Sequence, residues 1–161
     1  NASLVSGWYP VAADAAPALE EAMASLAAYV RENPSAYSYV FPVGGTYNYR
    51  FIAGTSTLSP HAFGIAIDLC SNPCDYWRWA TREQGQARLN SYPAGVVHIM
   101  ENHGFIWGGK WAHFDFLHFE YRPELILKAR YAAEDKQPWY AGFPEDAYTQ
   151  DCIEIIDDAL L

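Results

Sequence analysis

Two short segments of the chain concentrate side chains that can bind a metal ion. His61 and Asp68 lie in the first segment and His118 lies in the second. A catalytic zinc ion takes three protein ligands, mostly histidine and carboxylate, and keeps a fourth position open for water. These residues can supply the three ligands if the strands predicted at 65–69 and 118–121 lie side by side. The competing interpretation is that each histidine packs, caps or lies on the surface, as isolated histidines usually do.

Two further side chains could take part in hydrolysis at such a site. Asp115 precedes His118 by three residues, so a tight turn would bring its carboxylate over the attacking water. There it could accept a proton and later deliver it to the leaving amine. Arg50, the only arginine between residues 32 and 77, could stabilise negative charge on the former carbonyl oxygen, or it could clamp a substrate carboxylate.

The two segments together resemble a known family, the zinc-dependent D-alanyl-D-alanine carboxypeptidases. This family includes the enzymes of vancomycin-type resistance and the L-alanyl-D-glutamate endopeptidases of phages and bacilli. The resemblance covers residues 47–125, and the residues that carry it are Ser59-x-His61-x-x-Gly64-x-Ala66-x-Asp68 and Asp115-x-x-His118-Phe119-Glu120.

The resemblance implies a small α+β domain of the DD-peptidase and hedgehog type. Such a domain has a central antiparallel sheet, flanking helices and one zinc ion per chain. The resemblance assigns the zinc ligands to His61, Asp68 and His118, and the arginine that stabilises the transition state to Arg50. The catalytic carboxylate, which is glutamate in many members, maps onto Asp115. The shorter aspartate departs from that pattern, although some endopeptidase-like members share it.

Three more residues are candidates for roles around the site. Ser59 corresponds to a family position that lines the substrate site. Trp111 either packs in the core or the cleft wall, or forms a platform for a peptide substrate. Glu120 shares a strand face with His118 and could hydrogen-bond that imidazole. An ion pair with Arg122 is the alternative for Glu120.

The expected activity is hydrolysis of D-amino-acid-containing peptide bonds in bacterial peptidoglycan. The first hypothesis is a D-Ala-D-Ala carboxypeptidase. An L-Ala-D-Glu endopeptidase is the close alternative, because the motif does not separate exo from endo cleavage. A zinc-containing module that binds peptidoglycan without cleaving it is the third possibility, and Asp115 and Arg50 argue against it. The expected partner is the peptidoglycan stem peptide. We expect a monomer that acts outside the cytoplasm, whether periplasmic, envelope-associated or secreted.

Composition limits the class of protein. The 161 residues, 51% of them hydrophobic, suit a single metallopeptidase domain over 1–161. A net charge of −9 argues against nucleic-acid binding, and most of it lies in an acidic extension at 131–161. No run approaches the roughly 20 apolar residues of a membrane-spanning helix. The start at Asn1, without a basic and then apolar leader, is expected of a mature form that lacks its export signal.

The elements that must position these residues follow from hydrophobic spacing and from breakers. Asp14 is expected to cap the first helix, with Pro17 in its first turn. Residues 36–64 are predicted as short strands and loops, and further strands are predicted at 65–69 and 116–121. The predicted helices cover residues 14–32, 75–90, 93–103 and 123–130.

The chain has three cysteines, too few for a disulfide framework. Cys70 and Cys74 are close in sequence, which favours a small disulfide between them. A bridge between Cys70 and Cys152 is a second possibility. The third is unpaired thiols, with Cys70 packed as a small apolar residue.

Overall fold

The computed structural model describes residues 7–134 and residue 150 of the chain. The chain divides into two compact units, 1–126 and 127–161, and the sheet and every residue of the candidate site lie in the first. A single domain over 1–161 therefore stays a prediction. Most of the predicted acidic extension, 131–161, lies outside the described residues.

A three-stranded antiparallel sheet carries the candidate site. Its strands are β1 (Ala66–Asp68), β2 (Phe105–Trp107) and β3 (His118–Tyr121), in the order β1-β3-β2. The central strand β3 places His118 directly opposite Asp68, and Glu120 opposite both Ala66 and Ile106. Because helices flank this antiparallel sheet, the predicted α+β fold class is confirmed.

Alternation along the strands gives the sheet two different faces. Ile67 and Phe119 lie opposite each other on one face and are at most 1% exposed, and Trp107 follows in the same row. The other face carries Asp68 and His118. The first face therefore builds the apolar core, and the second presents the polar side chains.

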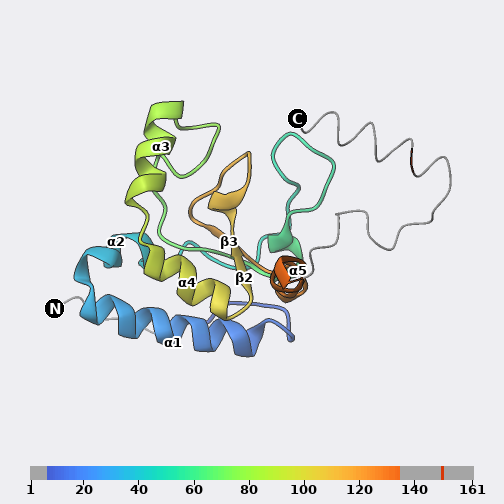
Figure 1. Ribbon diagram of the computed structural model, residues 1–161, viewed down its shortest axis with the longest axis horizontal. Coiled ribbons are helices and arrows are strands. Elements are labelled where there is room, and N and C mark those ends of the chain that lie inside the picture. The colour runs from blue at the N-terminus through green and yellow to red at the C-terminus, as the bar shows by residue number, and fades with distance from the viewer. Residues whose placement is uncertain (1–6, 135–149, 151–161) are drawn as a thin grey trace. The chain divides into compact units, whose positions relative to one another are not determined.

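Two helices complete that core, α1 (Ala16–Glu32) and α4 (Ala94–Asn102), which lie alongside each other (Figure 1). Their buried side chains join the sheet residues in one apolar cluster. The close approach depends on Gly95, because a Cβ there would lie 2.4 Å from the Tyr29 ring. The buried residues are Leu19, Ala22, Leu26 and Val30 on α1, and Val96, Val97 and Met100 on α4.

The remaining helices are α2 (Tyr37–Val40), α3 (Arg82–Ser91) and α5 (Pro123–Glu134). Three 3₁₀ helices also occur in the described residues, at Pro34–Ala36, Pro60–Phe63 and Gly108–Lys110. The prediction of strands and loops over 36–64 is thus wrong at α2, where Tyr39 packs edge-on against Tyr92. Burial of these aromatic rings outweighs their preference for strands.

Several predicted boundaries also need correction. The first helix begins after Ala15 without a side-chain cap, so Asp14 does not cap it, although Pro17 lies in the first turn as predicted. The helix expected from Asp75 begins only after Thr81, whose side chain forms a capping box with Gln84. The strand expected from 116 begins at 118, and the last helix continues to 134.

No disulfide joins Cys70 to Cys74, so the favoured pairing is wrong. Hydrogen bonds close the turn instead, with Asn72 Oδ1 accepting from the Cys74 N–H and the Asp75 carboxylate accepting from the Asn72 N–H. Cys152 lies outside the described residues. Among the helices of the described part of the chain, none has the length and apolar character needed to cross a membrane.

Candidate active site

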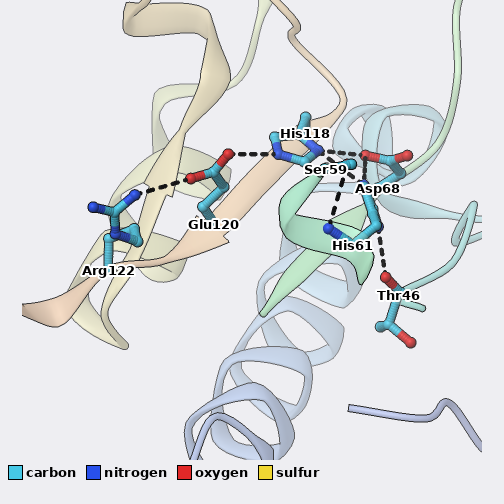
Figure 2. Close-up of polar contacts among 7 residues, drawn as sticks. All are labelled: Thr46, Ser59, His61, Asp68, His118, Glu120 and Arg122. Atoms are coloured by element: carbon cyan, nitrogen blue, oxygen red, sulfur yellow. Dashed lines mark hydrogen bonds and ion pairs between the residues drawn. The ribbon is translucent and has the colours of Figure 1, made fainter. Parts of the chain in front are cut away.

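Three donor atoms converge on the polar face of the sheet (Figure 2). Asp68 Oδ1 lies 3.1 Å from His61 Nε2 and 2.9 Å from His118 Nδ1, and the two nitrogens are 3.0 Å apart. A tetrahedral zinc ion with bonds of about 2.0–2.1 Å needs donor atoms about 3.3 Å apart. The structure therefore brings together the three predicted ligands in a group that a small outward movement would fit to one ion.

Strand register places Asp68 and His118 within reach of each other. The Leu69 N–H donates to the Leu117 carbonyl. Because hydrogen-bonded and non-hydrogen-bonded pairs alternate along an antiparallel ladder, the next pair, Asp68 and His118, exchanges no backbone hydrogen bonds. Side chains of such non-hydrogen-bonded pairs approach most closely in an antiparallel sheet. The pairing of β1 with β3, as predicted, therefore brings the side chains of Asp68 and His118 together.

His61 comes from the 3₁₀ helix Pro60–Phe63 rather than from a strand. Ser59 Oγ accepts a hydrogen bond from the His61 N–H at 3.4 Å and caps this turn. Gly64 ends it with a φ of 66°, and a Cβ there would lie 2.8 Å from the Ala12 nitrogen. The turn therefore requires glycine at this position, both for conformation and for space.

In each histidine, the ring nitrogen that points away from the cluster has a hydrogen-bond acceptor. That bond fixes which nitrogen carries the proton and leaves the other nitrogen facing the cluster. His61 Nδ1 donates to the Thr46 carbonyl, and Thr46 Oγ1 in turn donates to the Pro10 carbonyl at 2.6 Å. His118 Nε2 donates to Glu120 Oε1 at 3.2 Å. These outer bonds leave His61 Nε2 and His118 Nδ1 free to bind a metal ion.

Both contacts considered for Glu120 are present. Besides His118, it meets Arg122, whose Nη1 lies 3.5 Å from Oε2. Figure 2 shows the resulting run of polar contacts from Arg122 through Glu120 to the cluster. A carboxylate held between an imidazole and a guanidinium fixes the His118 ring in one orientation.

The charges of the cluster favour a cation at its centre. Burial alone would lower the pKa of His118, but hydrogen bonds to Asp68 and Glu120 outweigh it and raise this pKa to about 9. Burial alone would raise the pKa of Asp68, yet hydrogen bonds from His118 and His61 hold it well below its usual range. The cluster therefore stabilises positive charge at the point where the three atoms converge. Two imidazoles and one carboxylate are a donor set that suits zinc.

Asp115 supplies a further carboxylate near this cluster. Its Oδ1 is buried and has no hydrogen-bond partner among the described residues. Burial raises the pKa of this carboxyl to about 6, with the charge of His118 opposing the shift and that of Asp68 adding to it. An unpaired acceptor with a pKa near neutrality has the properties of a general base.

Arg50 lies at the base of an exposed hairpin in which Phe51 pairs with Leu58. Its carbonyl accepts from the Ser59 N–H at 2.9 Å, two residues before His61. Its positive charge lowers the pKa of Asp115, against the larger effect of burial.

The two predicted substrate contacts differ in exposure. Trp111 is 38% exposed, with its ring 5.5 Å from the His118 ring, whereas Trp107 on the other side of the glycine pair is buried. Ser59 is 2% exposed, and its hydroxyl positions the backbone of His61, so a direct contact between Ser59 and substrate stays a prediction. Trp111 also borders an open hollow of about 360 Å³, whose other lining residues are Ile106, Glu120, Arg122 and Leu125.

Thr46 is the residue that sequence reasoning missed. It contributes a backbone carbonyl to His61, and any residue type could supply that atom. The only signal in the sequence is its position directly after the Gly44-Gly45 pair, where the chain passes close to Asp68.

Residues 53–121 match the model of the family described as D-alanyl-D-alanine carboxypeptidase. The matched segment includes His61, Asp68, Asp115 and His118, while Arg50 lies just before it. This match confirms the resemblance and supports a peptidase. No curated protein matches the chain.

Proposed function

We propose that the protein is a zinc peptidase that hydrolyses D-amino-acid-containing peptide bonds of bacterial peptidoglycan, first of all as a D-Ala-D-Ala carboxypeptidase. The observation that carries this proposal is the unpaired Asp115 carboxylate beside the converging His61, Asp68 and His118 donors. These four residues lie within the segment that matches the carboxypeptidase family. A group that only bound metal for structure would need no fourth, unpaired carboxylate.

The metal part of the proposal rests on three ligands and the groups behind them. A zinc ion held by these ligands would polarise a carbonyl and lower the pKa of a bound water. His61 and His118 hold their rings through Thr46 and Glu120, so the ligands keep their orientation when substrate enters.

Asp115 has the proton-transfer role in this proposal. In the metal-free protein this carboxyl has a pKa of about 6, so at neutral pH it is mostly ionised, yet it binds a proton more readily than an ordinary aspartate does. Its unpaired oxygen can accept a proton from the attacking water and then pass it to the leaving amine. Arg50 would stabilise the oxyanion or hold the terminal carboxylate of the substrate.

The hollow beside Trp111 supports a peptide substrate. Apolar side chains and the Glu120–Arg122 pair line it, and Trp111 connects it to the His118 ring. We therefore propose that part of the stem peptide binds there. We also propose that the enzyme is a monomer and acts outside the cytoplasm.

A second candidate is an L-Ala-D-Glu endopeptidase. The aspartate at position 115 favours it, since many members of the family have glutamate there and some endopeptidase-like members have aspartate. A non-catalytic peptidoglycan-binding module is the third candidate, and the free Oδ1 of Asp115 argues against it.

Digestion of purified muropeptides with the zinc-loaded protein, followed by mass spectrometry, tests these candidates. Loss of one D-Ala from a pentapeptide stem would support the carboxypeptidase. Separation of L-Ala from D-Glu would support the endopeptidase instead. Binding of muropeptides with zinc present and no product would favour the binding module, and the Asp115→Asn protein is the matched inactive control.

A further inference from the structure

We infer that a buried ion pair between Asp75 and Arg88 is a positioning device for Asp115. Neither residue contacts the metal-binding cluster, and the role in proton transfer that Asp115 has here rests on the proposed function. The pair acts through the segment 114–116, which it holds from the side opposite Gly108.

The carboxylate of the ion pair is fully buried, and the Arg88 side chain is 10% exposed. Asp75 is 0% exposed, and its carboxylate accepts from Arg88 Nε at 2.6 Å and from Arg88 Nη2 at 3.4 Å. The Asn72 N–H donates to the same carboxylate at 2.7 Å. A buried carboxylate with these three donors has one stable position, because removal of any partner leaves charge unpaired in the interior.

The backbone of Asp75 is bound directly to the segment that contains Asp115. The Phe116 N–H donates to the Asp75 carbonyl at 2.8 Å, and the Trp77 N–H donates to the Phe114 carbonyl at 3.1 Å. Between these two bonds, Tyr76 forms an antiparallel bridge with Asp115. The stretch from Asp75 to Trp77 therefore runs antiparallel to 114–116, joined by one isolated bridge and two flanking hydrogen bonds.

On its other side, Asp115 meets the turn that follows β2. Its N–H donates to the Gly108 carbonyl at 3.1 Å, and a Cβ on Gly108 would lie 2.5 Å from the Asp115 carbonyl oxygen. The backbone of Asp115 is thus fixed from two directions. Only its side-chain oxygen Oδ1 lacks a partner among the described residues.

Helix α3 supplies the support behind this arrangement. Arg88 lies on α3, and its guanidinium also packs over the ring of Tyr39, at 4.2 Å from the centroid. Gly85, one turn earlier, faces the Phe114 ring, where an added Cβ would lie 2.6 Å from Cζ. Helix α3 therefore reaches the Asp115 segment at two points, through Arg88 and Asp75 and through Gly85 and Phe114.

The position of the Asp115 carboxylate should affect turnover more than it affects the binding of zinc or substrate. A displacement of about 1 Å of a catalytic group can cost about 10²-fold in rate. Loosening the Asp75–Arg88 pair should therefore lower kcat while the metal and the substrate still bind. A pair that only stabilised the fold would lower the melting temperature and leave kcat of the folded enzyme unchanged.

The test compares Arg88→Lys and Gly85→Ala with Gly95→Ala. Arg88→Lys keeps the charge but loses the two-pronged contact, and Gly85→Ala pushes on Phe114. Gly95→Ala is the matched control, since it creates a similar clash with the Tyr29 ring on the core side of the molecule. The measurements are zinc content, kcat and KM on muropeptides, and hydrogen exchange of the Phe116 amide.

We expect full zinc content in all three proteins. In Arg88→Lys and Gly85→Ala, kcat should fall about 10–100-fold with a smaller change in KM, and the Phe116 amide should exchange faster. Gly95→Ala should keep the wild-type kcat and the wild-type exchange of Phe116.

Wild-type kcat and wild-type Phe116 exchange in Arg88→Lys and Gly85→Ala would overturn the inference. So would loss of zinc from Arg88→Lys, because the pair would then support the metal ligands rather than Asp115. If the zinc-loaded wild-type protein cleaves no muropeptide, the proposed function fails separately. The exchange of Phe116 still decides whether Arg88 and Asp75 hold the 114–116 segment.

Discussion

The two halves of the candidate site differ in how completely their polar atoms are paired. In the metal-binding half, both histidines donate their outer N–H groups, to the Thr46 carbonyl and to Glu120. In the half that we propose for proton transfer, the backbone of Asp115 is fixed while its Oδ1 has no partner among the described residues. Full pairing holds atoms in place, whereas an unpaired buried acceptor costs stability and stays available for reaction.

The difference extends to the elements that carry each half. Asp68 and His118 face each other from two paired strands, and His61 comes from a capped turn. Asp115 and Arg50 lie outside the helices and strands of the described residues, in segments that other parts of the chain must hold. If this comparison is correct, mutations in the two halves should separate metal affinity from turnover.

The largest effect is expected from His118→Ala. It removes one ligand and leaves Asp68 without its shortest hydrogen bond, so stoichiometric zinc and all activity should be lost. Elemental analysis after dialysis measures the zinc content. His98→Ala, on the exposed side of α4, should keep one zinc per chain. Retention of zinc by His118→Ala would show that the ligand set is wrong.

Asp115→Asn should separate the two halves most clearly. We expect kcat to fall about 10²–10⁴-fold while zinc stays bound, because only the proton acceptor is removed. Undiminished activity in this protein would rule out Asp115 as the base.

The same substitution should stabilise the metal-free protein. Because the pKa of Asp115 rises from 3.8 to about 6 on folding, ionisation above pH 6 opposes the folded state, and asparagine does not ionise. The free energy of unfolding at pH 8 should therefore rise by about 1–3 kcal/mol. The gain should shrink as the pH falls through 6 and vanish below about 4. Urea unfolding at several pH values measures it, and an equal effect at pH 8 and pH 3.5 would contradict the stated cause.

A smaller effect is expected from Glu120→Gln. The imidazole of His118 would keep a hydrogen-bond acceptor but lose the negative charge behind it, so zinc affinity should fall about 10–100-fold. Competition with a chelator measures this affinity. Glu124→Gln is the matched control, because Glu124 is exposed and pairs with Arg122 rather than with a histidine. Equal affinities in the two variants would place Glu120 outside the metal-binding half.

The last prediction concerns the protons released when zinc binds. With the pKa of His118 at about 9 in the metal-free protein, zinc binding at pH 7.5 should release about one proton. Affinity should then rise about tenfold for each pH unit up to about 9, since the proton and the ion compete for Nδ1. Calorimetry in two buffers of different ionisation enthalpy counts the protons. Binding without proton release would mean that His118 is already neutral.

Local spacing predicted the core helices and the face of each strand. The isoleucines of the first strand indicated which face is buried, and this placed Asp68 on the polar face opposite His118. Parity within a strand is a local property, so a single sequence is enough to predict it. Spacing and residue type also suggested the roles of Asp115 and Arg50, and the family resemblance implied the same roles.

Contacts between distant residues were not predictable in the same way. The helix predicted from Asp75 begins only after Thr81, and Asp75 pairs instead with Arg88, 13 residues away. Nothing in the local pattern indicates that pairing. The α-helical turn at Tyr37–Val40 depends on burial against Tyr92, which overrides the strand preference of tyrosine. Thr46 acts through a backbone carbonyl, which has no sequence signature.

The opposed pair Asp68 and His118 also has a consequence for folding. These residues are 50 positions apart, so their meeting closes a long loop that includes α3, α4 and β2. Closing such a loop costs chain entropy before any contact across it forms. An ion held by both residues would act as a cross-link that keeps this loop closed and adds its binding free energy to folding. A chain in which β1 and β3 have not yet met cannot offer this complete set of ligands, so tight metal uptake should report that the sheet has formed.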